Sequence, residues 1–192
     1  MFTAMRLFAE KGYGSTSVAD ILREAGANSG SLYHAFPTKQ DLLVAVLHTY
    51  RSGIGPMLLE PAWADVEDPL QRVFALLDRY RAMLVDTGLL YGCPIGSLAL
   101  EIHEPDPPVR EALAENFSGW TAAIQACLDA AGSRLPSDLD RPGLAQLVLS
   151  VMEGGVMQAR THRDLAPYDA GVRLLRDYFQ RLQDAATKRD AR

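Results

Sequence analysis

Apolar residues recur every three or four positions along most of the chain, which is the spacing of residues on one face of an α-helix. The most regular stretch is the last one, where intervals of three and four residues alternate through Val172, Leu175, Phe179, Leu182 and Ala186. No stretch alternates apolar and polar residues in the way that a half-buried strand does. The pattern predicts an all-α fold with about nine helices.

Turn-forming glycines and prolines separate the apolar repeats and predict the helix ends. We expect helices at residues 1–11, 17–25, 29–35, 39–57, 69–86, 95–102, 109–131, 144–159 and 172–186. Gly53, Gly55 and Pro56 should weaken or end the fourth helix, and residues 61–68 should form a loop. We therefore predict two domains, comprising residues 1–50 and 51–192.

The first domain contains two short helices joined by a tight turn. Ser17 and Asp20 have the spacing of a capping box, and Gly26 suits the left-handed position at which the first helix stops. Asn28 is a good cap for the second helix, and Pro37 ends it. Either a helix-turn-helix or a plain helical hairpin within a larger bundle satisfies this spacing.

The residue types on the exposed face of the second short helix favour contact with DNA bases. Leu32 and Phe36 can face inward, which leaves small, polar and aromatic side chains outside: Ser29, Gly30, Ser31, Tyr33 and His34. Small residues allow close approach to base edges in a major groove, and polar ones can bind phosphates or bases. Lys39, at the start of the next helix, can add a phosphate contact.

Charge is distributed unevenly along the chain. The chain of 192 residues has a formal net charge of −5, but residues 1–51 hold five basic and four acidic side chains and so carry +1. An almost neutral first domain on an acidic second domain permits DNA contact through one face only, with modest affinity per protomer. Tight binding would therefore require a dimer.

The same stretch resembles the DNA-binding domain of the TetR family of transcriptional regulators. The resemblance rests on Leu7-Phe8-Ala9-Glu10-Lys11-Gly12-Tyr13, Thr16-Ser17-Val18, Ile21, Ala25-Gly26, Gly30-Ser31-Leu32-Tyr33, Phe36 and Lys39. It implies that Ser29 and Gly30 lie nearest the bases and that the surrounding polar residues hold phosphates. The DNA-binding set is then Thr16, Ser17, Ser29, Gly30, Ser31, Tyr33, His34 and Lys39.

The first helix is shorter than in that family. Its members usually carry further residues, some of them basic, before the position of Met1. We therefore expect fewer phosphate contacts from this helix. One alternative is a small-molecule-binding protein that has lost DNA binding through its short N-terminus.

The second domain offers no catalytic constellation. Its histidines are scattered, no pair has metal-ligand spacing on a helix, and glycine-rich phosphate loops are absent from the sequence. We expect no enzyme activity, metal site or cofactor. The absence of an apolar run of transmembrane length or a signal peptide predicts a cytoplasmic protein with no membrane partner.

Large apolar residues of the second domain either fill a core or line a pocket. Periodicity does not separate the two, but aromatic and methionine side chains suit a pocket for varied apolar molecules. The family resemblance implies an effector there. The predicted ligand-binding residues are Phe74, Tyr80, Met83, Cys93, Leu98, Ile102, Phe117, Trp120, Met152 and Met157.

The segment Gly92-Cys93-Pro94 looks like that of a TetR subgroup related to the LmrA/YxaF-type regulators. Cys93 lies near the start of a predicted helix, where the helix dipole can stabilise a thiolate. A similar cysteine senses electrophiles in NemR-like members, so sensing is one hypothesis. A small buried side chain at a tight bend is the other. Cys127, in the middle of a helix, is expected to be a core residue.

Two features of the last two helices suggest an interface. The adjacent glycines at 154 and 155 cost helix stability, which close helix approach or room for a ligand could offset. The family resemblance implies that these helices form a homodimer. The predicted dimer residues are Val151, Gly155, Ala159, Val172, Leu175, Phe179 and Leu182, although the same stripe could pack within one protomer.

Together these features predict a homodimeric, ligand-responsive repressor. It would bind a pseudo-palindromic double-stranded operator and be released by a small apolar or aromatic effector. The alternatives are a redox-sensing or electrophile-sensing repressor that uses Cys93, and the protein without DNA binding described above.

Overall fold

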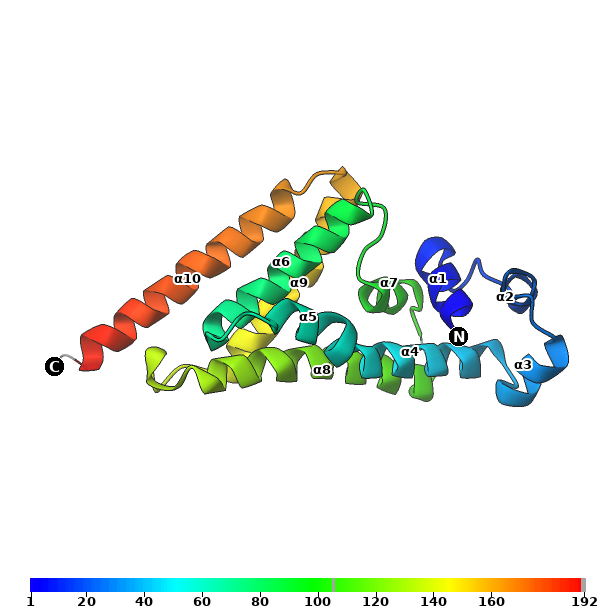
Figure 1. Ribbon diagram of the computed structural model, residues 1–192, viewed down its shortest axis with the longest axis horizontal. Helices are drawn as coiled ribbons and strands as arrows, with labels where there is room; N and C mark the ends of the chain where they lie inside the picture. Colours follow the sequence, from blue (N-terminus) through cyan, green and yellow to red (C-terminus); the bar gives the residue numbers. More distant parts are fainter. Residues whose placement is uncertain (105, 191–192) are drawn as a thin grey trace. The chain divides into compact units, whose positions relative to one another are not determined.

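The computed structural model describes residues 1–104 and 106–190, and within them the chain forms helices and connecting turns with no strand, which confirms the all-α prediction (Figure 1). The helices are α1 (Phe2–Lys11), α2 (Val18–Ala25), α3 (Ser29–Ala35), α4 (Lys39–Ile54), α5 (Glu60–Trp63), α6 (Pro69–Asp86), α7 (Pro94–Glu101), α8 (Pro107–Ala130), α9 (Arg141–His162) and α10 (Ala166–Asp190). A π-helical segment covers Gly55–Leu59 and a 3₁₀ turn covers Gly132–Arg134.

The fourth helix is longer than predicted. Instead of ending near Met57, it continues through the π-helical segment and α5, so that Lys39–Trp63 is one helix of 25 residues. Pro56 lacks an N–H, and the wider π turn accommodates it without ending the helix. With this stretch counted once, the described chain has nine α-helices, and the predicted loop begins at residue 64 rather than 61.

This long helix also corrects the prediction that no apolar run reaches transmembrane length. By length and composition alone it could cross a membrane, with a mean hydropathy of 1.3 over an 18-residue window. However, four of its apolar residues are buried inside the protein: Leu42, Leu43, Val46 and Leu47. In all, 22% of that window is buried inside the protein.

The helices group into two compact units. The first comprises Met1–Gly53 and Cys93–Phe117, and the second comprises 54–92 and the chain from Ser118 onwards. The domain boundary predicted at residue 50 from the helix-weakening residues stays a prediction. In space, α7 and the first part of α8 belong to the same compact unit as the three N-terminal helices.

The first unit has a continuous apolar core. Ala4, Leu7 and Phe8 from α1 and Ile21 from α2 are buried together with the four buried residues of α4. The side chain of Asn116 is fully buried, and its amide donates to the carbonyls of Leu47 (3.0 Å) and Ala112 (2.8 Å). These bonds tie α8 to α4 within this unit.

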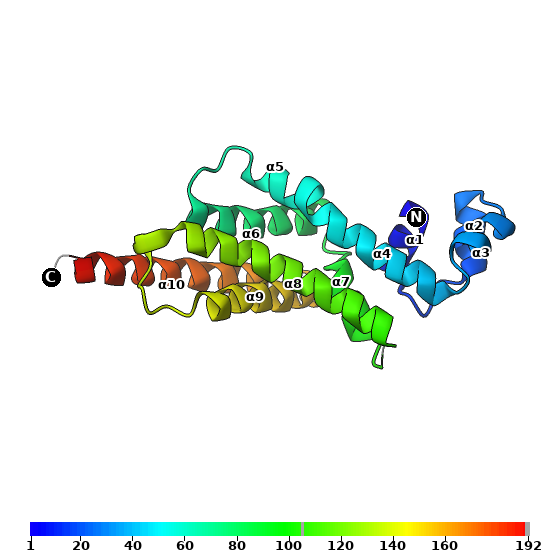
Figure 2. The ribbon, with the colours of Figure 1, turned by 90° about the horizontal axis from the view of Figure 1, so that it is seen from below.

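The second unit is centred on α6, α9 and α10. Helices α9 and α10 pack against each other, and Figure 2 shows them side by side. The Tyr168 hydroxyl donates to the carbonyl of Leu77 at 2.8 Å, and the rings of Phe74 and Phe179 meet edge to face at 5.0 Å. Both contacts join α10 to α6.

Candidate DNA interface

Capping fixes the start of α2. The Ser17 hydroxyl accepts from the backbone N–H of Asp20 (3.0 Å), while the Asp20 carboxylate accepts from the N–H of Ser17 (3.1 Å) and from its hydroxyl (2.5 Å). Arg23 also binds this carboxylate. Hydrogen bonds from Ser17, with a contribution from Arg23, lower the pKa of Asp20 to about 2. The predicted capping box is therefore confirmed.

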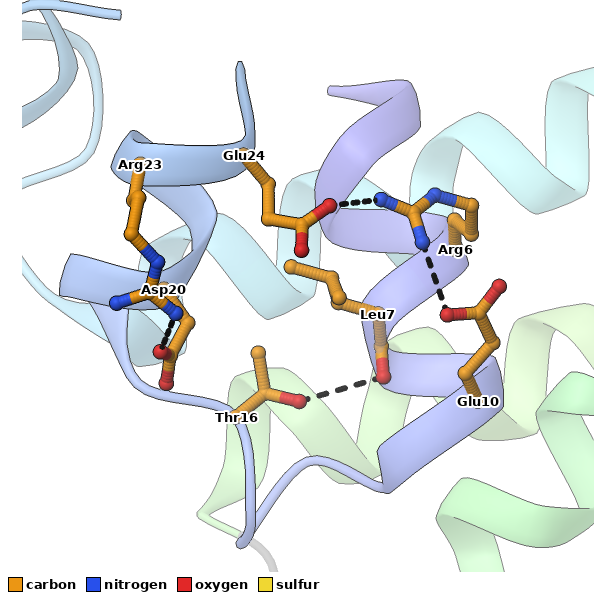
Figure 3. Close-up of polar contacts among 7 residues, drawn as sticks. All are labelled: Arg6, Leu7, Glu10, Thr16, Asp20, Arg23 and Glu24. Atoms are coloured by element: carbon orange, nitrogen blue, oxygen red, sulfur yellow. Dashed lines mark hydrogen bonds and ion pairs between the residues drawn. The ribbon is translucent and has the colours of Figure 1, made fainter. Parts of the chain in front are cut away.

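Ion pairs join α1 to α2 (Figure 3). Arg6 binds Glu24 at 2.5 Å and Glu10 at 2.9 Å, so that one guanidinium connects the two helices. These partners occupy Arg6, and Asp20 occupies Arg23. Two of the basic side chains in this part of the chain are therefore neutralised by neighbours. This agrees with an interface of low positive charge.

The exposed face of α3 matches the composition predicted for a reading helix. No residue of α3 is fully buried, and Ser29, Gly30, Ser31, Tyr33 and His34 are all exposed, Tyr33 by half of its surface. Asn28 caps the helix by accepting from the N–H of Gly30 at 2.8 Å. The helix therefore presents small and polar groups outward on a capped start.

Thr16 is not on this surface. Its side chain is fully buried, and its hydroxyl donates to the carbonyls of Gly12 (2.7 Å) and Leu7 (3.3 Å; the latter bond is drawn in Figure 3). The hydroxyl closes the turn between α1 and α2 and cannot reach a phosphate in this conformation. We correct its predicted role from DNA contact to support of the fold.

Lys39 points toward the same turn. Its ammonium group donates to the carbonyl of Tyr13 and lies 4.0 Å from the centre of the Tyr13 ring. Partial burial lowers the pKa of Lys39, and the nearby carboxylate of Glu101 acts in the opposite direction. The predicted phosphate contact therefore requires this side chain to leave its position on Tyr13.

Glu101, the last residue of α7, contacts the turn between α1 and α2, and the sequence did not predict this contact. Its carboxylate accepts from the backbone N–H groups of Tyr13 (2.8 Å) and Gly14 (2.6 Å). Gly12 has a φ of +85°, and a Cβ there would lie 3.0 Å from the same carboxylate. The glycine was visible in the sequence as a helix stop, but nothing in the pattern indicated a partner 88 residues away.

The predicted ligand-binding residues are divided between the two units. Most are buried, and Tyr80 and Trp120 form an edge-to-face pair at 5.4 Å in the second unit. Met83 and Met157 differ: 39% and 51% of their surfaces are exposed, so they do not line an internal pocket of this chain. The remaining residues are buried or half-buried: Phe74, Tyr80, Cys93, Leu98, Ile102, Phe117, Trp120 and Met152. Their role as an effector pocket stays a prediction.

A hollow of about 470 Å³ lies elsewhere, at the connection between α8 and α9. Asp129, Leu135 and Arg141 are among its lining residues, and none of the predicted ligand residues is. Both cysteines are buried, Cys127 within α8 as expected and Cys93 at the residue that precedes α7. Among the described residues, no group of three histidine, cysteine or acidic side chains could hold a metal ion.

Most of the predicted dimer residues pack inside their own protomer. Gly155, Ala159, Val172, Leu175 and Phe179 are buried, and Val151 and Leu182 are half-buried. A Cβ on Gly155 would meet Tyr168 at 3.0 Å, so this glycine serves contact between α9 and α10 of one chain. A stripe of apolar residues in the sequence predicts that one face of a helix is buried. It does not show whether that face packs against a helix of the same chain or of a second copy. The exposed apolar residues of these helices are instead Leu147, Met157, Leu174 and Tyr178.

Comparison with known proteins assigns both parts of the chain. Residues 2–46 match the bacterial regulatory protein family tetR, and residues 69–171 match the C-terminal domain of LmrA/YxaF-like transcriptional regulators. The transcriptional regulator YxaF of Bacillus subtilis is 30% identical over 87% of this chain and 86% of its own.

Two further matches cover nearly the full length. A helix-turn-helix-type regulator of Mycobacterium tuberculosis is 32% identical over 91% of this chain and 89% of its own. The crystal structure of a TetR regulatory protein from Rhodobacter sphaeroides superposes with a TM-score of 0.80 at 26% identity, covering 91% of this chain and 95% of that one. The capped helix-turn-helix, the helical fold and these matches agree that the chain belongs to the TetR family of transcriptional regulators, in the group with an LmrA/YxaF-like C-terminal domain.

Proposed function

We propose that this regulator is a repressor that binds a pseudo-palindromic operator as a homodimer and leaves it when a small apolar or aromatic effector binds. The observation that carries the proposal is α3: a short, capped helix whose outward residues are all small, polar or aromatic. Residues 1–50 supply DNA binding and residues 51–192 supply effector binding and dimerisation. The protein works in the cytoplasm and catalyses no reaction.

At the operator, Ser29 and Gly30 approach the base edges. Ser17, Ser31, Tyr33 and His34 hold phosphates around them, and their exposure supports this assignment. Lys39 contributes only after release from Tyr13. Two α3 helices must enter successive major grooves about 34–36 Å apart.

The homodimer uses the outer faces of α9 and α10. Leu174 and Tyr178 are exposed one turn apart on α10, and Leu147 and Met157 are exposed on α9. Exposed apolar residues at helical spacing favour contact with a second copy. This face replaces the inward stripe that the sequence alone suggested.

The effector binds among the buried apolar residues of the second unit, Phe74, Tyr80, Trp120 and Met152, because aromatic and flexible side chains bind varied apolar molecules. The alternative is that modification of Cys93 releases DNA, although its thiol is only 3% exposed. Cys93→Ser separates the two. Unchanged effector-driven release in this variant excludes the cysteine mechanism, while lost release with retained effector binding supports it.

DNA binding tests the whole proposal. We expect the protein to select a two-fold-related sequence from a random duplex pool, with affinity that falls as salt rises. Replacing Ser31 and His34 with alanine should weaken binding to that duplex while the helical content is unchanged. Failure of the unmodified protein to bind any duplex at low salt would sink the repressor hypothesis and favour a small-molecule-binding protein.

A further inference from the structure

We infer that Glu101 is a positioning residue that links α7 to the helix-turn-helix, so that DNA binding and the conformation of α7 control each other through one carboxylate. The inference rests on the proposed DNA-binding function and adds a specific residue to it. All of its contacts lie within the first compact unit.

The turn between α1 and α2 is held from two sides by opposite charges. The carboxylate of Glu101 accepts two hydrogen bonds, from the N–H groups of Tyr13 and Gly14. Lys39 donates to the carbonyl of Tyr13 from the start of α4. The peptide groups of the turn are therefore bound by the end of α7 on one side and by the beginning of α4 on the other.

Chain geometry makes this contact specific. The charged carboxylate accepts hydrogen bonds from two consecutive backbone N–H groups. Hydrogen bonds to an ionised acceptor are stronger than hydrogen bonds between neutral groups. Gly12 has a positive φ and no Cβ, and any larger residue would crowd the carboxylate at 3.0 Å. The turn is therefore shaped to admit Glu101 closely.

The position of Glu101 gives the contact a functional consequence. The turn leads directly into Thr16, whose buried hydroxyl closes it, and into Ser17, which caps α2. A shift of α7 therefore moves the start of α2 and, through Lys39, the start of α4. Because coupling between two sites is reciprocal, DNA that stabilises this conformation of the turn also stabilises the position of α7.

Cys93 offers a reporter of α7 that needs no effector. It immediately precedes α7, and its thiol is buried, so labelling it requires local opening of this segment. Cys127 is buried in the part of α8 that belongs to the second unit and serves as the internal control. N-ethylmaleimide labelling of each thiol can be followed separately by peptide mass spectrometry.

The experiment compares labelling with and without a duplex selected by the unmodified protein from a random pool. We expect saturating DNA to slow labelling of Cys93 by about fivefold or more in the unmodified protein, which corresponds to an ordinary coupling energy. Labelling of Cys127 should not change. In Glu101→Ala the protection of Cys93 should fall below about twofold.

Two further variants sharpen the result. Glu104→Ala removes the same charge from an exposed position three residues on and should retain full protection. Glu101→Gln keeps one acceptor oxygen and should give intermediate protection, which also covers the case in which the alanine variant does not fold. Equal protection of Cys93 in all variants at saturating DNA, or none in the unmodified protein, overturns the inference alone. Absence of DNA binding by the unmodified protein overturns the proposed function as well.

Discussion

At the residue scale, position in the turn matters more than residue type. Thr16 and Ser17 are adjacent hydroxyl residues, and the sequence suggested DNA contact for both. In the structure Thr16 is buried and its hydroxyl donates to two backbone carbonyls, whereas Ser17 is exposed and caps α2. The sequence does not distinguish the roles of these two residues, because the burial of each depends on how α1 packs against the turn.

We expect Thr16→Val to destabilise the fold without removing a DNA contact. The valine has nearly the same shape but leaves the part-buried carbonyl of Gly12 and the buried carbonyl of Leu7 without this donor, at a cost of about 1–3 kcal/mol. Urea unfolding should show the loss, and the folded variant should bind the selected duplex with the affinity of the unmodified protein. A weaker affinity of the folded variant would mean that Thr16 contacts DNA.

Asp20 predicts a pH-dependent contribution to stability. Its pKa in the folded protein is about 2 against an ordinary value of 3.8, mainly because Ser17 and Arg23 bind its charged form. A lowered pKa stabilises the fold above the ordinary value, and this contribution is lost as the pH falls from 3.8 toward 2. Asp20→Ala should therefore lower the urea midpoint at pH 7, with a difference that shrinks over that interval. A difference independent of pH would contradict the assignment of this charge.

At the element scale, local patterns predicted helices well and their partners poorly. Caps at Ser17 and Asn28 were visible because each acts within a few residues. The π-helical segment Gly55–Leu59 was not visible in the sequence, because glycine and proline ordinarily end helices. The turns on either side of it show that the helix continues. The contact from Glu101 to the first turn was equally hidden, because it depends on tertiary packing.

The adjacent glycines of α9 should respond in opposite ways to alanine. A Cβ on Gly154 meets nothing within 4 Å, so Gly154→Ala should stabilise the helix by about 1 kcal/mol. A Cβ on Gly155 meets Tyr168 at 3.0 Å and its backbone at 3.2 Å, so Gly155→Ala should force α9 and α10 apart and lower stability. Thermal unfolding of the two variants checks the signs. Destabilisation by both would indicate that Gly154 also lies against a partner.

At the scale of the whole molecule, the fold and family were predictable from sequence, whereas the residues of a dimer interface stay a prediction. The first 46 residues carry a local pattern that matches a family, and helical spacing predicted the rest of the all-α fold. The regular stripe of α10 proved to be the inward one, with Phe179 packed against Phe74. A surface for a second copy must therefore be found among exposed residues, which periodicity does not distinguish from solvated ones.

Leu174 provides the test of that surface, with Leu100 as a matched control. Both leucines are 65% exposed, Leu174 on α10 and Leu100 on α7, so the same substitution perturbs folding equally little. Leu174→Glu should place two like charges in the proposed dimer contact and shift the protein to monomer in light scattering. Because each protomer contributes only one weakly charged DNA-binding surface, affinity for the selected duplex should fall by about 100-fold or more when the second is lost. Leu100→Glu should leave the oligomeric state in light scattering unchanged. A Leu174→Glu protein that stays dimeric and binds DNA normally would place the interface on another face.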